Sequence, residues 1–323
     1  MINYQTKKFN IFQLMYISCI LFLIILLVST PQTAILAFGQ GVLIWATKIL
    51  PGLLPFFILT SLLSYTSFIA TTGKIISPIT QKLYGVGGTS GYVYIMSILS
   101  GYPMGAKLTS DLYKNGQITK SHAHTISSFT STSGPLFVIG TVGIGFFNNQ
   151  TMGIVVLTCH FLGALINGLL YRNKEKSFLV YSIKPKLSNN FLNDTMTSSV
   201  SSIMLIGGFV AIFYMSLTLL TNINVFEPIA ILFENLGINK NITTSIISGI
   251  IEVTTGELQL SQCALSFEAN TIISTFIISF GGLSIHAQAY SFMKEFEMSY
   301  PKFLLQKFTH AIISTILSLL VLI

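Results

Sequence analysis

The stretch that decides the fold is Ser100-Gly101-Tyr102-Pro103-Met104-Gly105-Ala106-Lys107, a polar sequence broken by glycines inside an apolar region. A similar break, Ser248-Gly249-Ile250-Ile251-Glu252-Val253-Thr254-Thr255-Gly256, occupies the corresponding place in the second half. Each is followed by a second interruption, at Ser131-Thr132-Ser133-Gly134-Pro135 and at Gly281-Gly282-Leu283-Ser284-Ile285-His286-Ala287-Gln288. Backbone freed from helical hydrogen bonds is tolerated inside a membrane only where protein or a water-filled cavity satisfies it. Paired breaks at corresponding positions therefore predict a binding site between two repeats.

Composition defines the surroundings of these breaks. Hydrophobic residues make up 51% of the chain, charged residues only 8%, and the mean hydropathy is +0.73. A soluble domain carries roughly a quarter charged residues, so the composition predicts an all-α polytopic membrane protein. The apolar run 11–28 follows Lys7 and Lys8 and is long enough to span a bilayer. No small-residue cleavage site follows it, so we expect a retained first helix.

The distribution of basic residues predicts the topology. Lys7 and Lys8 indicate a cytoplasmic N-terminus, and the basic residues between Arg172 and Lys186 indicate a cytoplasmic loop. Lys302 and Lys307 are interpreted as a cytoplasmic flank of the last crossing. Each half then has three crossings and one hairpin, and an odd number of crossings inverts the second unit relative to the first. The predicted parts are an N-terminal transmembrane helix at 1–30, a first repeat at 31–171, a cytoplasmic basic loop at 172–195, and a second, inverted repeat at 196–323.

The lengths of the apolar segments predict the parts of each repeat. Residues 91–110 are too few for two spans, because each leg of about ten residues reaches roughly 15 Å, half the hydrocarbon thickness. A re-entrant hairpin is predicted there and at 242–260, where Glu252 lies near the tip. Residues 122–147 and 271–290 are predicted to be crossings broken at their glycines. The stretch 34–64 holds Pro51 and Pro55 and predicts one long, kinked element.

Several strings resemble a known family. LPGLLPFF at 50–57, SGYPMGAK, SGP with a following GTVG, EVTTG and SFGGLSIHAQ are similar to those of the YlbJ (stage V sporulation protein V) family of sporulation integral membrane proteins. The resemblance runs from about Leu50 to Phe303. It implies a nucleoside recognition, or gate, type of domain, and movement of dipicolinate across the outer forespore membrane. The broader class looks like concentrative nucleoside carriers. The compact termini and short central loop leave open a paralogue with another substrate.

Two charged residues lie in the paired breaks. An ammonium near mid-membrane, as predicted for Lys107, costs about 2.5–3.5 kcal/mol on insertion scales and is usually retained for a partner or ligand. The alternative is that Lys107 reaches the cytoplasmic interface and anchors the loop. Glu252 holds the mirrored position with the opposite charge. We expect it to couple an ion or a proton, or else to pair with Lys107.

The other candidates surround the glycines. His286 can change its charge near neutral pH, although a lone histidine is more often a hydrogen-bonding residue. Amides at Ser133 and Gly134, where a helix restarts, favour an anionic group, whereas the alternative is that the hydroxyls satisfy freed backbone. The predicted substrate-binding residues are Gly101, Tyr102, Pro103, Gly105, Lys107, Ser133, Gly134, Pro135, Thr254, Thr255, Gly256, Gly281, Gly282, Ser284, His286 and Gln288.

The leading prediction is a carrier for a small organic anion, with dipicolinate favoured by the resemblance. The alternatives are a carrier for nucleosides or related solutes, in which Gln288 would contact neutral groups, and a non-transporting factor of spore or envelope maturation. No hydrolase, phosphate-loop or zinc spacing is visible, so we expect no enzyme activity, no metal and no cofactor. The expected setting is the bacterial cell membrane, with the lipid bilayer as partner, no nucleic acid, and a homo-oligomer left open.

Overall fold

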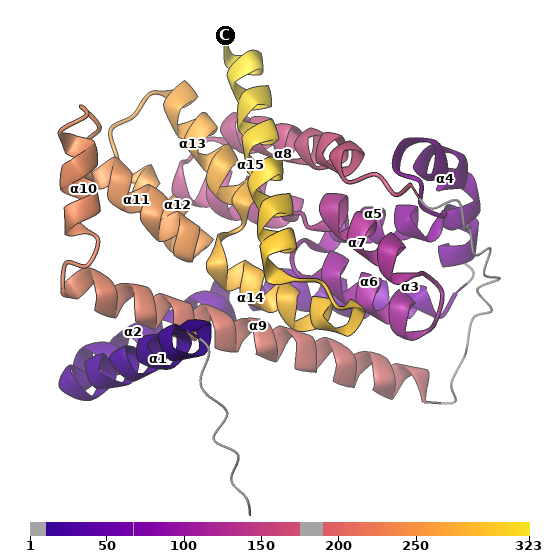
Figure 1. The fold of residues 1–323 in the computed structure, drawn as a ribbon, viewed down its shortest axis with the longest axis horizontal. Coiled ribbons are helices and arrows are strands. Elements are labelled where there is room, and N and C mark those ends of the chain that lie inside the picture. Colours follow the sequence, from indigo (N-terminus) through magenta and orange to yellow (C-terminus); the bar gives the residue numbers. More distant parts are fainter. Residues whose placement is uncertain (1–10, 67, 175–189) are drawn as a thin grey trace, which may run out of the picture.

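The structure is a computed structural model that describes residues 11–66, 68–174 and 190–323, which form helices and contain no strand (Figure 1). Helices satisfy their backbone hydrogen bonds internally, as a membrane requires. The stretches long and apolar enough to cross a bilayer are Pro31–Leu63, Gln150–Leu170, Phe191–Asn222, Phe267–Phe296 and Tyr300–Leu322. Shorter apolar helices cover Leu14–Ser29 and Leu136–Phe146. The prediction of an all-helical, multi-pass membrane protein is confirmed.

The N-terminal part contains the predicted long, kinked element. It follows α1 (Ile11–Ser29) and consists of α2 (Pro31–Ile44), the π-helical turn η1 (Trp45–Ile49) and α3 (Leu50–Ser64) without a gap. The sequence predicts this kink from proline alone. The structure adds a π turn before Pro51, in which the N–H of Leu50 donates to the carbonyl of Trp45. Such turns change the direction of side chains and are frequent at functional sites.

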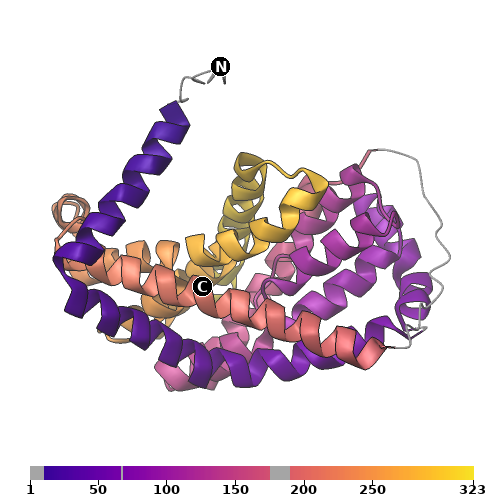
Figure 2. The same cartoon turned by 90° about the horizontal axis from the view of Figure 1, so that it is seen from below.

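The long helix α9 (Phe191–Asn222) packs against this element (Figure 2). It begins inside the segment 172–195 that was predicted to be a loop, of which 175–189 lie outside the described residues. The indole Nε1 of Trp45 donates to the carbonyl of Ile203 at 3.1 Å. A methyl group on Gly207 would lie 2.6 Å from the Trp45 ring. Small residues let membrane helices approach closely, and Gly207 has this role in α9.

We expect Gly207→Leu to destabilise the protein, whereas Gly208→Leu, one residue along the same helix, should be nearly neutral. Gly207 is buried against Trp45, but a methyl group on exposed Gly208 meets no atom within 4 Å. Overpacking typically costs about 1–3 kcal/mol. Both changes alter helix propensity equally, so the difference between their thermal unfolding midpoints in detergent isolates the packing effect. Equal midpoints would mean that α9 does not pack on Trp45.

The first half continues with α4 (Phe68–Tyr84), followed by two short helices in the place of the first predicted hairpin. These are α5 (Thr89–Ser100) and α6 (Met104–Lys114), joined across Gly101 to Pro103. The crossing predicted at 122–147 is broken, as expected. It consists of α7 (Lys120–Thr130) and the π-helix η2 (Leu136–Phe146), and α8 (Gln150–Leu170) follows it.

The second half repeats this order of elements. After α10 (Glu227–Glu234) come the short helices α11 (Lys240–Ile251) and α12 (Val253–Ser261), then α13 (Phe267–Phe280), α14 (Gly282–Met293), the 3₁₀ turn η3 (Lys294–Phe296) and α15 (Tyr300–Leu322). Helices α11 and α12 lie side by side (Figure 1). A methyl group on Gly256 would lie 2.2 Å from the Cα of Gly249, so this contact requires glycine. Gly281 ends α13 in the left-handed conformation, with φ +87°.

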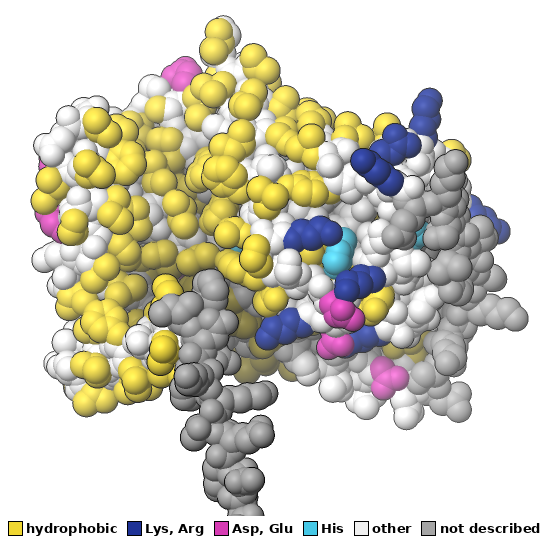
Figure 3. Space-filling view, in the orientation of Figure 1, with side chains coloured by type: hydrophobic (Ala, Val, Ile, Leu, Met, Phe, Trp, Pro, Cys, Tyr) yellow, Lys and Arg dark blue, Asp and Glu magenta, His cyan; other side chains and the backbone are white. Residues whose placement is uncertain are grey.

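Lysine and arginine side chains gather on one part of the surface, whereas hydrophobic side chains cover much of α10 to α13 and the end of α15 (Figure 3). Lys114 pairs with Glu295 at 3.1 Å, and Lys120 pairs with Glu297 at 2.6 Å. The hydrogen bond from Lys120 lowers the pKa of the exposed Glu297 carboxyl. The connection between α6 and α7 therefore lies beside the connection between α14 and α15. Both connections were predicted to be cytoplasmic from their basic residues.

Candidate binding cavity between the helix breaks

The four predicted breaks come together in space. A methyl group on Gly101, which has φ +76°, would lie 2.5 Å from the backbone nitrogen of Gly134, so the two breaks of the first half touch. In the second half, a methyl group on Gly282 would lie 3.0 Å from the carbonyl oxygen of Gly249. The two halves meet where a methyl group on Gly281 would lie 3.3 Å from the hydroxyl of Tyr102.

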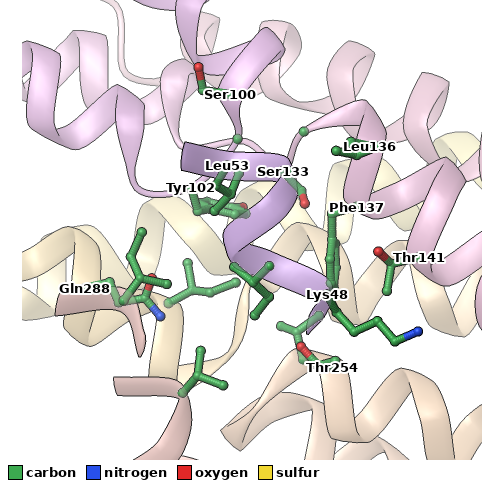
Figure 4. Close-up of a pocket in the computed structure, with 18 of the residues that line it drawn as sticks. Lys48, Leu53, Ser100, Tyr102, Ser133, Leu136, Phe137, Thr141, Thr254 and Gln288 are labelled. Atoms are coloured by element: carbon green, nitrogen blue, oxygen red, sulfur yellow. The ribbon is translucent and has the colours of Figure 1, made fainter. Parts of the chain in front are cut away.

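A cavity opens among these breaks, with about 90 Å³ open to the centre of a water molecule. One water needs roughly 10–15 Å³ by this measure, so the space exceeds that of a single water. Leu53, Phe56 and Phe137 supply apolar wall. Figure 4 shows polar side chains from both halves, Tyr102, Ser133, Thr254 and Gln288, around the same space. Apolar walls with a few convergent polar groups are typical of small-molecule sites.

The cavity brings together about half of the residues predicted from the sequence. Those that line it are Gly101, Tyr102, Ser133, Gly134, Glu252, Thr254, Ser284 and Gln288. The others lie outside the lining, and they are Pro103, Gly105, Lys107, Pro135, Thr255, Gly256, Gly281, Gly282 and His286. Several of these are packing positions: a methyl group on Gly105, for example, would lie 2.0 Å from the carbonyl oxygen of Thr130.

Glu252 lines the cavity, but its carboxylate is occupied by its own helix. It receives hydrogen bonds from the N–H groups of Thr254 at 3.2 Å and Thr255 at 2.8 Å, and from the Thr255 hydroxyl at 2.8 Å. This is an N-cap of α12, with a negative charge at the positive end of the helix. The ion-coupling role of Glu252 stays a prediction. Its visible contacts are those of a structural cap.

Lys107 lies away from the cavity. Its ammonium donates to the hydroxyl of Ser198 on α9 at 2.9 Å. The acidic side chain that acts on it electrostatically is Asp111, one turn further along α6. Among the described residues, the ion pairs do not include one between Lys107 and Glu252. A role of Lys107 in substrate binding stays a prediction, and the contact seen is one between α6 and α9.

His286 ties a break to a neighbouring helix. Its Nε2 lies 2.8 Å from the carbonyl oxygen of Phe280, and its Nδ1 lies 3.3 Å from the hydroxyl of Tyr300. A carbonyl can only accept, so Nε2 carries the hydrogen, and Nδ1 of the neutral ring accepts from Tyr300. These contacts match the alternative considered above, a histidine with satisfied hydrogen bonds.

The amide of Ser133 has a partner that sequence reasoning missed. Its N–H donates to Nε2 of His160 on α8 at 2.8 Å, so this amide is directed to His160 and not to the cavity. The Nδ1 of the same ring lies 2.9 Å from the hydroxyl of Ser279 on α13. His160 is fully buried and joins the breaks of the two halves. A histidine inside an apolar crossing is the signal that could have indicated it.

Two lysines were also missed. Lys48 lies in the π turn η1 and lines the cavity, a position that the sequence did not predict. Lys307 had been interpreted as a cytoplasmic flank, and that is wrong, because it is 1% exposed and donates to the carbonyl of Ser131 at 2.9 Å. Its position three residues before His310 in an apolar helix was the available signal.

Together, the helices and the cavity define a class: a multi-pass, all-helical membrane protein whose helix breaks enclose a small-molecule-sized site. The family model described as Gate, nucleoside recognition, matches residues 46–150, which contain both breaks of the first half. The chain is 29% identical to the sporulation integral membrane protein YlbJ of Bacillus subtilis (strain 168), over 95% of this chain and 82% of that protein. The resemblance predicted from the motifs is confirmed. No solved structure matches the chain.

Proposed function

We propose that this protein is a membrane carrier for a small organic anion, which binds in the cavity between the breaks. The observation that carries the proposal is the balance of charge around the cavity. Lys48 lines it, and Lys307 lies directly behind the lining residue Tyr102, to whose hydroxyl it donates. The one carboxylate in the lining, Glu252, is neutralised in part by the N-terminus of α12. An anion brought to membrane depth needs such compensation.

Dipicolinate is the substrate we favour. Its aromatic ring suits the apolar wall of Leu53, Phe56 and Phe137. Its carboxylates suit the positive charge of Lys48 in the lining and that of Lys307 behind Tyr102. The similar protein of Bacillus subtilis is named as a sporulation integral membrane protein, which supports a sporulation role. With that role, the site of action would be the outer forespore membrane. We expect no enzyme activity, because the cavity residues form no constellation of nucleophile and base.

A nucleoside carrier is the second candidate. The family model that matches 46–150 is described as nucleoside recognition, and Gln288 in the cavity wall offers both a donor and an acceptor to a neutral base or sugar. A third candidate is a factor of spore or envelope maturation that transports nothing and uses the breaks to bind a partner helix.

Uptake into proteoliposomes separates these candidates. Uptake of labelled dipicolinate, an aliphatic dicarboxylate and a nucleoside would be compared. The competitors would be picolinate, which has one carboxylate, and the uncharged diamide of dipicolinate. We expect saturable dipicolinate uptake that picolinate inhibits weakly and the diamide does not inhibit. Uptake of the nucleoside alone would support the second candidate. No uptake of any solute by protein with a sharp thermal unfolding transition would contradict the carrier and support the third.

We further propose that the two halves are inverted repeats, which puts the C-terminus outside the cell. The matching order of short helix pair and broken crossing in each half supports this arrangement. In a chain without its native cysteines, a cysteine added after Ile323 should react with an impermeant thiol reagent from outside. Lys174→Cys should react only after the membrane is opened. Lys174 is exposed, whereas the neighbouring Asn173 is buried and would be a poor reporter. The reverse labelling would contradict the inversion.

A further inference from the structure

Lys307 is the most deeply buried charge at the meeting point of the breaks. It lies in α15 with 1% of its surface exposed. Its ammonium donates to the hydroxyl of Tyr102, to the carbonyl of Ser131 at 2.9 Å and to Nδ1 of His310 at 3.3 Å. It also lies 4.7 Å from the centre of the Tyr102 ring. All three ammonium hydrogens are therefore used, and two of them go to residues in the breaks of the first half.

Among the residues that the structure describes, no carboxylate pairs with this charge. The ion pairs in which both partners are described residues join Lys114 to Glu295, Lys120 to Glu297 and Lys240 to Glu227, and none of them involves Lys307. The titratable groups that face Lys307 from the elements packed around it are Tyr102 from the first break, His160 from α8, His286 from α14 and His310 from α15. Tyrosine and histidine side chains carry no negative charge at neutral pH, so none of these four groups balances the ammonium.

The histidines act as fixed acceptors. His310 Nε2 lies 2.9 Å from the carbonyl oxygen of His160, so this nitrogen carries the hydrogen, and the neutral ring accepts from Lys307 through Nδ1. The Nε2 of His160 accepts from the N–H of Ser133, so that ring is held neutral as well. The amine of Lys307 is thus the group in this cluster where a proton can be added or removed without breaking a histidine contact to backbone.

We propose that Lys307 is the proton-coupling site of the carrier, so that the organic anion and one proton cross together. This inference rests on the proposed function. The amine takes up a proton from water on one side to become an ammonium, and it releases the same proton to water on the other side. No covalent bond other than this N–H bond forms or breaks.

Proton and anion binding are linked through Tyr102. This residue lines the cavity and accepts a hydrogen bond from Lys307, so an anion in the cavity lies one side chain away from the ammonium. Negative charge there favours the protonated amine, and by reciprocity the protonated amine favours the anion. Without the anion, a buried ammonium lacking a counter-charge is costly, which favours release of the proton.

The same contacts link protonation to the shape of the site. Tyr102 follows Gly101, and Ser131 precedes Gly134, so Lys307 holds together the two breaks that touch. Any movement that separates these breaks to open the cavity also removes two acceptors from the ammonium. Opening and proton release are therefore expected to accompany each other.

The test uses the full chain in proteoliposomes that contain a pH-sensitive dye, with dipicolinate as the probe. We expect an inward proton gradient to drive dipicolinate accumulation and dipicolinate to carry protons inward. Lys307→Arg keeps the positive charge but cannot release a proton. It should lose gradient-driven accumulation by at least about tenfold, since one pH unit of driving force corresponds to tenfold, yet still exchange labelled for unlabelled anion at equal pH. Lys302→Met, an exposed lysine of the same helix, should leave both measurements unchanged.

The outcomes decide between coupling and a structural charge. Coupled accumulation in Lys307→Arg would overturn the proposal, because charge without proton release would then suffice. Wild-type transport without proton movement would overturn it as well, while leaving the carrier function intact. No transport of any anion by the wild type would remove the carrier function and this inference with it. If Lys307→Arg does not fold, His310→Gln provides the second variant. It weakens an acceptor of the ammonium, so the pH of half-maximal accumulation should fall. An unchanged pH profile would count against the proposal.

Discussion

Replacing Gly101 by alanine should abolish transport, with a loss of about 100-fold or more, while the protein still inserts into the membrane. Gly101 has φ +76°, and a methyl group on it would lie 2.5 Å from the nitrogen of Gly134. With ψ −167° as well, this backbone conformation is almost restricted to glycine and costs another residue about 1–3 kcal/mol, and the clash must also push the two breaks apart. A displacement of about 1 Å in a binding site can cost 100-fold in rate. Dipicolinate exchange in proteoliposomes measures the loss.

The chain offers a matched control for this substitution. Gly116, in the turn between α6 and α7, also has a positive φ, of +66°, but a methyl group there meets no atom within 4 Å. Gly116→Ala therefore places alanine at a positive φ without the clash, and it should retain most of the transport. If both variants transported equally well, the contact between the Gly101 and Gly134 breaks would be irrelevant to function.

Replacing Glu252 by alanine should have the second large effect. The carboxylate receives three hydrogen bonds from Thr254 and Thr255 at the start of α12 and is 4% exposed. Loss of an N-cap costs about 0.5–2 kcal/mol, and hydrogen bonds to a charged group are stronger than neutral ones. We expect a loss of about 2 kcal/mol or more in unfolding free energy. Because Glu252 and Thr254 line the cavity, transport should fall as well.

Glu252→Gln separates a structural cap from ion coupling. The amide keeps one oxygen acceptor but loses the charge, so stability should fall by less than in Glu252→Ala. If Glu252 acts only as a cap, the number of protons moved per dipicolinate should stay as in the wild type. If the sequence-based prediction of ion coupling is correct, that ratio should drop toward zero. Dye-reported proton entry alongside labelled uptake distinguishes the two results.

The breaks themselves were predictable from sequence because their requirements are local. Gly101 and Gly281 adopt positive φ angles that other residues rarely accept, and they stand inside apolar sequence too short or too interrupted for continuous spans. The same local reasoning predicted the separate helices on either side of Gly134. It also predicted a part of the cavity lining, since residues next to a break share its location.

The positions of the charges could not be predicted in this way. Lys307 lies in the first turns of α15, close to the exposed Lys302, and by sequence both look like a cytoplasmic flank. Lys307 is buried because the breaks at Tyr102 and Ser131, far away in sequence, fold over its side chain. Lys107 shows the opposite case. It stands in the most distinctive motif, but its side chain points from α6 toward α9 and donates to Ser198 there.

The sequence by itself therefore determined the class of protein, the number and place of the breaks, and the kinked course of 31–64. These depend on hydropathy, segment length and the backbone needs of glycine and proline, which are properties of neighbouring residues. Tertiary structure alone decided which charges face the cavity. It joined Ser133 to His160, capped α12 with Glu252 and placed Lys307 behind Tyr102. The reason is that a buried polar group must find its partner wherever packing brings one, and that partner is usually distant in sequence.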